Sequence, residues 1–328
     1  MSSVTSQKTR LSSERIARAY RAIDPPFRNT PQFEAADLGE RFGCHLVVKA
    51  ETLNPIRSFK ARGAQFFVSE LAGRPHLVCS SSGNFGQGMA YATRQRGLAL
   101  TVFVNAPANP LKVARMRALG ADVHLMDGNA DDALAMAREF AAEHGALLVV
   151  DGHEPAIAEG AGTIALELLR WPEPFDVILV PLGDGALLSG ISCWVKVHAP
   201  GVRMIGVCAA GSPAMERSWR TGQIVSAAAQ TIAEGISIQT PCAAAVANLT
   251  VLADDVISVD DVALIAAMQL AHRDIGLVLE PSGAAALAAL AVHTERFRGQ
   301  RIGAVLTGGN VAPEQMQQWL GVRGSIGI

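Results

Sequence analysis

Residues 54–64 read Asn-Pro-Ile-Arg-Ser-Phe-Lys-Ala-Arg-Gly-Ala, and they place one lysine, Lys60, among small and apolar side chains. Pro55 disfavours helical geometry at Asn54, so the segment predicts a turn. A helix that includes residues 62–71 is predicted next, with Ser58 as its cap and Lys60 in its first turn. A cation is unfavourable there, because the macrodipole places partial positive charge at a helix N-terminus. The pattern therefore singles out Lys60.

Lys60 has two interpretations from these residues alone. Desolvation of the amine would favour its neutral, nucleophilic form, which is the form that makes a Schiff base. The same residues also fit a surface lysine that happens to begin a helix, since most lysines are exposed. The rest of the chain has to decide between them.

The composition is that of a globular enzyme. The length of 328 residues fits two domains, or one large α/β unit with an insert. The net charge of −2, without basic blocks, gives no sign of nucleic-acid binding. The polar N-terminus predicts neither a signal peptide nor a membrane anchor, and we expect no regulatory module after Ile328. Five scattered cysteines indicate reduced thiols in the cytoplasm, not disulfides or zinc ligands (Cys44, Cys79, Cys193, Cys208 and Cys242).

Short apolar runs alternate with helical stretches along most of the chain, which is typical of a parallel α/β sheet. The alternation predicts a small α/β domain at residues 75–151, inserted into a larger domain made of residues 1–74 and 152–328. Strands are expected at residues 44–48, 77–79, 100–104, 122–126, 146–150, 177–182, 203–207 and 302–306. Helices are expected at residues 13–21, 86–96, 110–119, 131–144, 157–169, 186–198, 262–272, 283–294 and 313–320.

Three loops rich in glycine, serine or threonine follow apolar strands, where open α/β sheets bind their ligands. Residues 80–88 offer amides and hydroxyls suited to a carboxylate, and residues 183–190 let backbone amides surround a phosphate. In the third loop, residues 307–310, the Thr307 hydroxyl is suited to a heterocycle nitrogen. Each loop alone also fits a simple turn. Together with Lys60, however, they predict pyridoxal phosphate, which needs a lysine, a phosphate cradle and a partner for its ring nitrogen.

From about residue 16 to residue 310 the chain resembles the serine/threonine dehydratase family of fold-type-II pyridoxal-phosphate enzymes, which includes serine racemases. Six motifs carry the resemblance in order: residues 58–64, 81–84, 183–187, 231–236, 280–281 and 307–310. The resemblance implies an α/β fold like that of the tryptophan synthase β subunit. Two open, mostly parallel α/β lobes would hold the cofactor between them.

The resemblance also implies roles for the loop residues. Lys60 would attach pyridoxal 5'-phosphate covalently, Phe59 would pack beside its ring, and Asn84 would bond its phenolic oxygen. Thr307 would face the pyridine nitrogen and Glu280 would lie near the ring, although Glu280 also fits a cap or salt-bridge residue. The phosphate would lie on Gly183, Asp184, Gly185, Ala186 and Leu187. The substrate carboxylate would lie on Ser81, Ser82, Gly83, Asn84 and Phe85.

Four positions depart from the pattern of the family. Asp184 adds a carboxylate to a loop that is usually almost all glycine, which is costly unless the side chain points to solvent, so we expect no role for that carboxylate. Phe85 replaces a common histidine and makes the substrate side more apolar. Cys208, placed after a strand ending at residue 207, replaces an acidic metal ligand, so we expect no metal site. Arg57 replaces a small residue; it either faces solvent or pairs with a second substrate carboxylate.

These expectations describe a pyridoxal-phosphate-dependent carbon–oxygen lyase of the dehydratase or ammonia-lyase kind. It would convert a β-hydroxy-α-amino acid to a 2-oxo acid and ammonia. L-Threonine or L-serine is the default substrate, and Phe85 favours a bulkier one such as L-threo-phenylserine. The alternatives are an amino-acid racemase with Ser82 as second proton carrier, a β-replacement enzyme, and a non-catalytic cofactor-binding protein. We expect a cytoplasmic homodimer with a small amino-acid substrate as its ligand and with neither nucleic-acid nor membrane partners.

Overall fold

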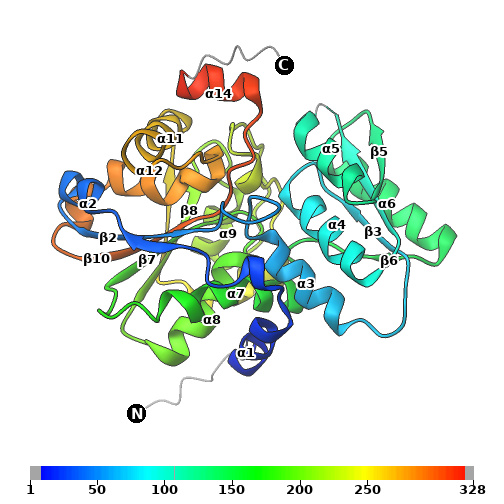
Figure 1. The fold of residues 1–328 in the computed structure, drawn as a ribbon, viewed down its shortest axis with the longest axis horizontal. Coiled ribbons are helices and arrows are strands. Elements are labelled where there is room, and N and C mark those ends of the chain that lie inside the picture. The colour runs from blue at the N-terminus through cyan, green and yellow to red at the C-terminus, as the bar shows by residue number, and fades with distance from the viewer. Residues whose placement is uncertain (1–8, 107, 322–328) are drawn as a thin grey trace.

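Apolar strands separated by helices form two sheets in the computed structural model, which describes residues 9–106 and 108–321. The larger sheet has the strand order β1-β2-β10-β7-β8-β9 and the smaller one β5-β4-β3-β6. The two sheets lie side by side, with helix α3 between them (Figure 1). The strands are β1 (Gln32–Glu34), β2 (His45–Ala50), β3 (Leu77–Ser80), β4 (Leu100–Asn105), β5 (Asp122–Met126), β6 (Leu147–Leu148), β7 (Val177–Pro181), β8 (Arg203–Ala209), β9 (Asp255–Val259) and β10 (Arg301–Leu306).

Helices cover both faces of each sheet. The α-helices are α1 (Ser13–Ala22), α2 (Ala36–Phe42), α3 (Lys60–Glu70), α4 (Asn84–Arg96), α5 (Pro110–Ala118), α6 (Ala130–His144), α7 (Pro155–Leu168), α8 (Ala186–His198), α9 (Ala214–Thr221), α10 (Ala243–Leu252), α11 (Asp261–Ile275), α12 (Ala285–Val292), α13 (Thr294–Phe297) and α14 (Pro313–Leu320). Short 3-10 helices are η1 (Pro25–Phe27), η2 (Glu234–Ile236) and η3 (Pro281–Ala284).

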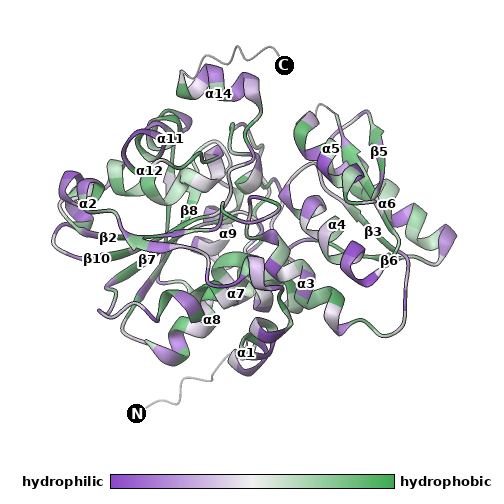
Figure 2. Ribbon diagram, in the orientation of Figure 1, coloured by the Kyte–Doolittle hydropathy of each residue, from purple (hydrophilic) through white to green (hydrophobic). Residues whose placement is uncertain are grey.

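The larger sheet is buried on both faces, as near-continuous apolar strands require. In β7, Val177 and Leu179 pack towards α11 and α12, whereas Ile178 and Val180 pack towards α7 and α8. This alternation follows from the two-residue period of a strand. Figure 2 shows the apolar colouring of these strands and of α12. The sheet pairs are parallel as predicted, except that β1 pairs with β2 in the antiparallel sense.

The smaller sheet consists of strands β3 to β6, which all fall within residues 75–151. Alternate residues of its central strands pack against α4 and α5 on one face and against α6 on the other. We propose that residues 75–151 form the smaller domain and that the remainder forms the larger one. With this arrangement the carboxyl ends of strands from both sheets face the same region.

Several elements differ from the sequence-based predictions. Helix α3 begins at Lys60, and its N-cap is Phe59; Ser58 only accepts a long bond (3.4 Å) from the Lys60 N–H. Strand β8 continues to Ala209, so Cys208 lies inside the strand, opposite Ser258, and does not follow it. The predictions also missed short elements such as α2, α9, α10 and β9. Helix α10 is almost uniformly apolar and so carries little periodicity, and α2, α9 and β9 are brief.

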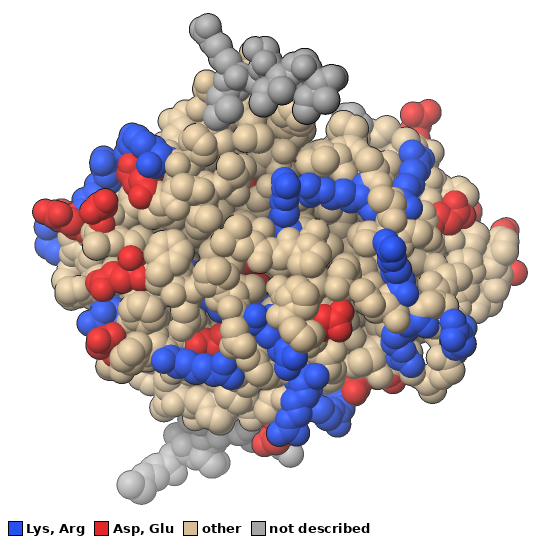
Figure 3. Space-filling model, in the orientation of Figure 1, with Lys and Arg blue, Asp and Glu red and all other residues tan. Residues whose placement is uncertain are grey.

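The surface carries charges of both signs, interspersed over the face shown in Figure 3. All five cysteines are free thiols, as predicted. Within the described ranges, none of the helices combines the length and the apolar character needed to cross a membrane.

Candidate active site

A cavity of about 320 Å³ lies where the loops of the two sheets meet. Lys60 and Phe59 reach it from the start of α3, and the loops after β3, β7 and β10 line it. Of the residues predicted for the site, all but Ala186 line this cavity (Phe59, Lys60, Ser81, Ser82, Gly83, Asn84, Phe85, Gly183, Asp184, Gly185, Leu187, Glu280 and Thr307). The structure thus brings together three loops that are far apart in the sequence.

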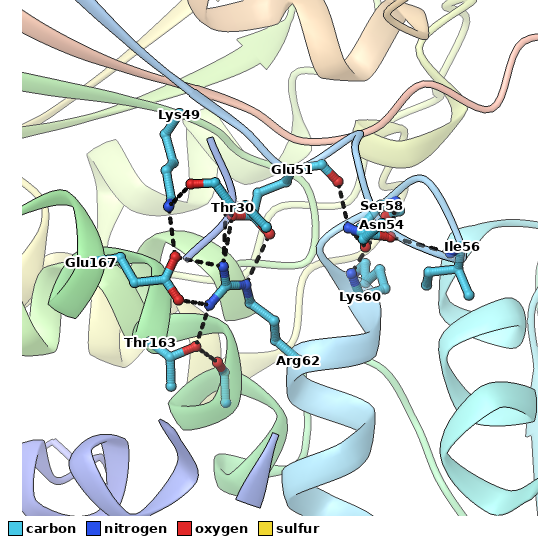
Figure 4. A network of polar contacts seen from close by, with 11 residues as sticks. Thr30, Lys49, Glu51, Asn54, Ile56, Ser58, Lys60, Arg62, Thr163 and Glu167 are labelled. Carbon is cyan, nitrogen blue, oxygen red and sulfur yellow. Dashed lines mark hydrogen bonds and ion pairs between the residues drawn. The ribbon is translucent and has the colours of Figure 1, made fainter. Parts of the chain in front are cut away.

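A buried network of charges holds α3 behind the lysine (Figure 4). Arg62 is 0% exposed, and its guanidinium donates hydrogen bonds to both oxygens of Glu51 (3.0 and 2.9 Å) and of Glu167 (2.8 and 2.9 Å). Lys49 donates to Glu167 at 2.6 Å. Two cations therefore balance two carboxylates in the core, and paired buried charges of this kind fix geometry strictly. Because Arg62 lies two residues after Lys60, the network fixes the first turn of α3.

The Lys60 ammonium forms ion pairs with two carboxylates. Its Nζ lies 2.5 Å from Asp151 Oδ2 and 2.8 Å from Asp184 Oδ2. Burial alone would lower the pKa of Lys60, but the charges of Asp151 and Asp184 and the hydrogen bonds to them raise it overall. The pKa of Lys60 is therefore raised and not lowered. The first interpretation of the sequence, in which desolvation favours the neutral amine, is wrong for the lysine in this structure.

The two carboxylates have different surroundings. Burial and the neighbouring charge of Asp184 raise the pKa of Asp151 to about 7. Burial would also raise the pKa of Asp184, but Lys60 and the Ala186 N–H, which donates to Asp184 Oδ1 at 2.7 Å, hold it below its usual value. The Asp184 side chain points into the cavity and not to solvent. The Lys60 ammonium and the Ala186 N–H stabilise the Asp184 carboxylate, and they offset the electrostatic cost expected for a carboxylate in this loop.

Asn84 begins α4 and is fixed from both sides of its amide. Its Nδ2 donates a short hydrogen bond to Glu280 Oε1, and its Oδ1 accepts one from Asn310 Nδ2 at 2.8 Å. The Lys112 Nζ lies 3.5 Å from Glu280 Oε2 and 3.3 Å from Glu234 Oε2. Burial would lower the pKa of Lys112, but Glu280 and Glu234 raise it. Asn84 thus belongs to a charged network that joins the two sheets.

The loop after β3, which the sequence predicts to bind a carboxylate, forms a tight turn into α4. Ser81 Oγ accepts hydrogen bonds from the N–H groups of Gly83 (3.2 Å) and Gly86 (3.0 Å), and these bonds hold the turn into α4. Ser82 and Phe85 line the cavity beside it. The N-terminal end of a helix that faces a cavity favours a negative group.

Sequence reasoning missed four charged residues that line the cavity (Lys112, Asp131, Asp151 and Glu234). Asp151 directly follows the predicted strand at residues 146–150, so its place at a strand end was a usable signal. Lys112 lies within α5, and no local pattern distinguishes it from a surface lysine.

Arg57 and Cys208 lie outside the cavity. Arg57 is exposed, has a φ of 52°, and is not among the residues that line the cavity. Cys208 is buried in β8. In the part of the chain that the structure describes, no three or more His, Cys, Asp or Glu side chains gather in a way that could hold a metal ion.

Comparisons with known proteins agree on one family. A family model described as pyridoxal-phosphate dependent enzyme matches residues 23–308. The chain is 33% identical to an L-threo-3-hydroxyaspartate ammonia-lyase of a Pseudomonas species, over 92% of this chain and 95% of that protein. It is 32% identical to the biosynthetic L-threonine dehydratase of Salmonella typhimurium, over 86% of this chain but only 56% of that longer protein.

Solved structures support the predicted fold class. Maize serine racemase superposes with a TM-score of 0.89 at 27% identity, covering 94% of this chain and 96% of that one. A threonine deaminase from T.th. superposes with a TM-score of 0.86 at 32% identity, covering 91% of this chain and 98% of that one. The fold-type-II architecture with two mostly parallel lobes is confirmed.

The cavity residues fit pyridoxal 5'-phosphate. Gly185 has a φ of +94°, and a Cβ on it would lie 2.9 Å from Ala245 Cβ, so the loop before α8 tolerates only glycine there. The loop precedes a 13-residue helix whose N-terminal amides favour a phosphate. Lys60 supplies an amine in the same cavity, and Glu280 Oε2 and Asp151 Oδ1 are buried without hydrogen-bond partners among the described residues.

Proposed function

Since the chain belongs to the pyridoxal-phosphate-dependent enzymes, and among them to the serine/threonine dehydratase family, we propose that it is an ammonia-lyase acting on a β-hydroxy-α-amino acid. The products are a 2-oxo acid and ammonia. The observation that carries this proposal is the meeting of Lys60, the glycine-rich loop and the residue 81–85 loop in one cavity. The named relatives are ammonia-lyases and dehydratases, so the dehydratase class is confirmed. Carbon–nitrogen lyase replaces the expected label of carbon–oxygen lyase.

We assign the residues as follows. Lys60 would hold the cofactor through its amine and would accept the Cα proton of the substrate. Gly183, Gly185, Ala186 and Leu187 offer backbone amides to the phosphate. Phe59, Thr307 and Asn84, the last fixed by Glu280, line the same cavity and would hold the ring of the cofactor.

The substrate is held by the loop after β3. The backbone of residues 81–85 and the Ser82 hydroxyl receive its carboxylate, because the start of α4 faces the cavity there. When bound, pyridoxal 5'-phosphate supplies the electron sink that makes the Cα proton removable. Lys60 takes that proton at hydrogen-bond range while the loop keeps the Cα–H bond aimed at its Nζ. Loss of the β-hydroxyl as water leaves an enamine, which hydrolyses to the 2-oxo acid and ammonia.

The charges in the cavity favour a substrate with a neutral side chain. Five carboxylates line it against two lysines (Asp131, Asp151, Asp184, Glu234 and Glu280 against Lys60 and Lys112). Lys112 already faces two of these carboxylates, and Arg57 does not line the cavity. A second substrate carboxylate would meet repulsion from largely buried members of this set such as Asp184 and Glu280, because like charges at close range disfavour binding. L-Threonine and L-serine are therefore preferred over L-threo-3-hydroxyaspartate, and L-threo-phenylserine tests the apolar surface of Phe85.

The test is 2-oxo acid release by purified, cofactor-loaded protein from L-threonine, L-serine, L-threo-3-hydroxyaspartate and L-threo-phenylserine. We expect turnover of the neutral substrates at a kcat/KM at least tenfold above that for hydroxyaspartate. Lys60→Ala should abolish both turnover and the visible absorbance of the lysine-bound cofactor. Cofactor absorbance with no oxo acid from any of the four would refute the proposal.

Racemisation is the second candidate, because Ser82 lines the same cavity as Lys60. Chiral chromatography of L-serine incubated with the protein would detect the D-isomer, and Ser82→Ala should remove it. We also propose a cytoplasmic homodimer, on the ground of the resemblance and the five free thiols. Sedimentation at micromolar concentration tests the dimer.

A further inference from the structure

Two carboxylates contact the reactive amine, and their environments differ. Asp184 Oδ1 accepts a hydrogen bond from the Ala186 N–H at the start of α8, so its charge is stabilised by a helix N-terminus. Asp151 Oδ2 lies 2.5 Å from the Lys60 Nζ, its carboxyl also faces Asp184, and its Oδ1 is buried without a hydrogen-bond partner among the described residues. When the surroundings of two neighbouring carboxyl groups separate their pKa values in this way, one group commonly acts as an acid and the other stays an anion.

The chain holds Asp151 firmly at this place. It begins the turn between β6 and α7, where the backbone passes from the smaller sheet to the larger one. Gly152 has a φ of +80°, and a Cβ there would lie 3.0 Å from Asp184 Cβ. The turn therefore packs directly on the loop that carries Asp184. The Asp151 turn is thereby held against the Asp184 loop, and both carboxylates lie in contact with the Lys60 Nζ.

We propose that Asp151 is a catalytic acid that passes the proton from Lys60 to the departing β-hydroxyl. This inference rests on the proposed function, since it concerns the elimination step of that reaction. It assigns Asp184 the part of a fixed anion, which keeps the Lys60 amine in place and does not exchange protons.

The step balances in atoms and electrons. The Cα–H bond breaks, its proton goes to the Lys60 Nζ, and its electron pair becomes the second bond between Cα and Cβ. The Cβ–O bond breaks with its pair remaining on oxygen, and this oxygen takes the proton of the Asp151 carboxyl, so water leaves. The Lys60 ammonium then returns its proton to Asp151 across the 2.5 Å contact. Both residues end as they began.

The charges around Asp151 are compatible with this role. Lys60 and Asp184 face its carboxyl directly. The Cys79 thiol on β3 is the third titratable neighbour; burial and the Asp151 charge raise its pKa to about 12, so it stays protonated. Burial and Asp184 raise the pKa of Asp151 itself, so near neutral pH a fraction of the carboxyl carries the proton that the step requires.

The decisive experiment compares two leaving groups in Asp151→Asn. Hydroxide must be protonated to leave L-serine, whereas chloride leaves β-chloro-L-alanine without a proton. We expect kcat on L-serine to fall by about 10²- to 10⁴-fold, the range for a lost general acid, and kcat on β-chloro-L-alanine to change by less than about fivefold. Asp127→Asn, an exposed aspartate after β5, is the matched control and should change neither.

A readout that does not depend on turnover separates the acid from a structural role. The absorbance of the lysine-bound cofactor should persist in Asp151→Asn. In D2O the variant should still exchange the Cα proton of L-serine, followed by NMR, while forming little pyruvate. Equal losses on both substrates, or loss of the exchange, would overturn the inference.

The wild-type protein offers a test that needs no variant. For L-serine, kcat/KM should decline as the pH rises through the pKa of Asp151, and the same limb should be missing with β-chloro-L-alanine. Identical profiles for the two substrates would overturn the inference and leave the ammonia-lyase function intact. If the wild-type protein releases no oxo acid from any hydroxy amino acid, the proposed function fails, and the inference with it.

Discussion

Replacing Arg62 by methionine removes one cation from the buried network behind Lys60. The four charges, Lys49, Glu51, Arg62 and Glu167, sum to zero, and the variant leaves a net charge of −1 in the core. Glu167 keeps Lys49 at 2.6 Å, but Glu51 keeps only the Thr30 hydroxyl at 2.5 Å. Removing one partner of a buried ion pair costs about 3–5 kcal/mol. That loss is a large fraction of the roughly 5–15 kcal/mol by which typical proteins are stable.

Urea unfolding followed by circular dichroism would measure the loss. Arg62→Met combined with Glu51→Gln restores neutrality and should recover most of the stability. Arg18→Met is the surface control: Arg18 is 55% exposed and pairs with Glu70, so its loss should cost less than about 1 kcal/mol. A loss of less than about 1 kcal/mol in Arg62→Met, or no recovery in the double variant, would refute the reasoning.

The pH dependence of the same variant gives an independent check. An unpaired buried carboxylate has a folded-state pKa above its unfolded value, so the folded state binds more protons than the unfolded one between these two values. The stability deficit of Arg62→Met should therefore shrink as the pH falls from about 8 towards about 5. A deficit that grows on acidification would contradict this sign.

Three further predictions concern single contacts. Lys112→Met leaves Glu280 buried without its cation, so unfolding by urea should show a loss of about 1–3 kcal/mol, mostly recovered by adding Glu280→Gln. Gly185→Ala forces a side chain into left-handed backbone and towards Ala245, so titration of cofactor absorbance should show at least tenfold weaker binding, and unchanged binding would contradict the assigned cradle. Asn109→Ala removes the cap that accepts from the Leu111 N–H at 3.0 Å, which should cost about 1 kcal/mol in urea unfolding without affecting turnover.

Local signals in the sequence predicted much of the fold. Helix α5 begins after Asn109 and Pro110, as the cap and the first-turn proline indicated, and α8 has the predicted bounds because the glycine-rich loop precedes it and a proline follows it. The three loops were placed correctly, since they follow strands that the apolar runs identify. Strand and helix ends without such markers, as at β8, were misplaced.

Contacts between distant residues were beyond the sequence patterns. Lys60 and Asp151 are 91 residues apart, and Arg62 and Glu167 are 105 apart. Neither the periodicity of apolar residues nor the spacing of motifs indicates which charged side chains come into contact when two sheets pack together. For the same reason no role was predicted for the Asp184 carboxylate, as distinct from its backbone, because the cost of that charge depends on Lys60 lying beside it. The assigned roles of the individual site residues stay predictions until variants are measured.

The buried charges behind α3 and the residues that line the cavity lie in separate places. The network around Arg62 lies behind α3 and holds the lysine without touching the cavity. Other cavity-lining groups, such as Ser82, Phe85 and Lys112, lie on loops and helices of the smaller sheet. Substitutions at these positions can therefore change the pocket without touching the charges that hold α3. This separation lets the lining of the pocket vary while the position of Lys60 at the start of α3 is kept.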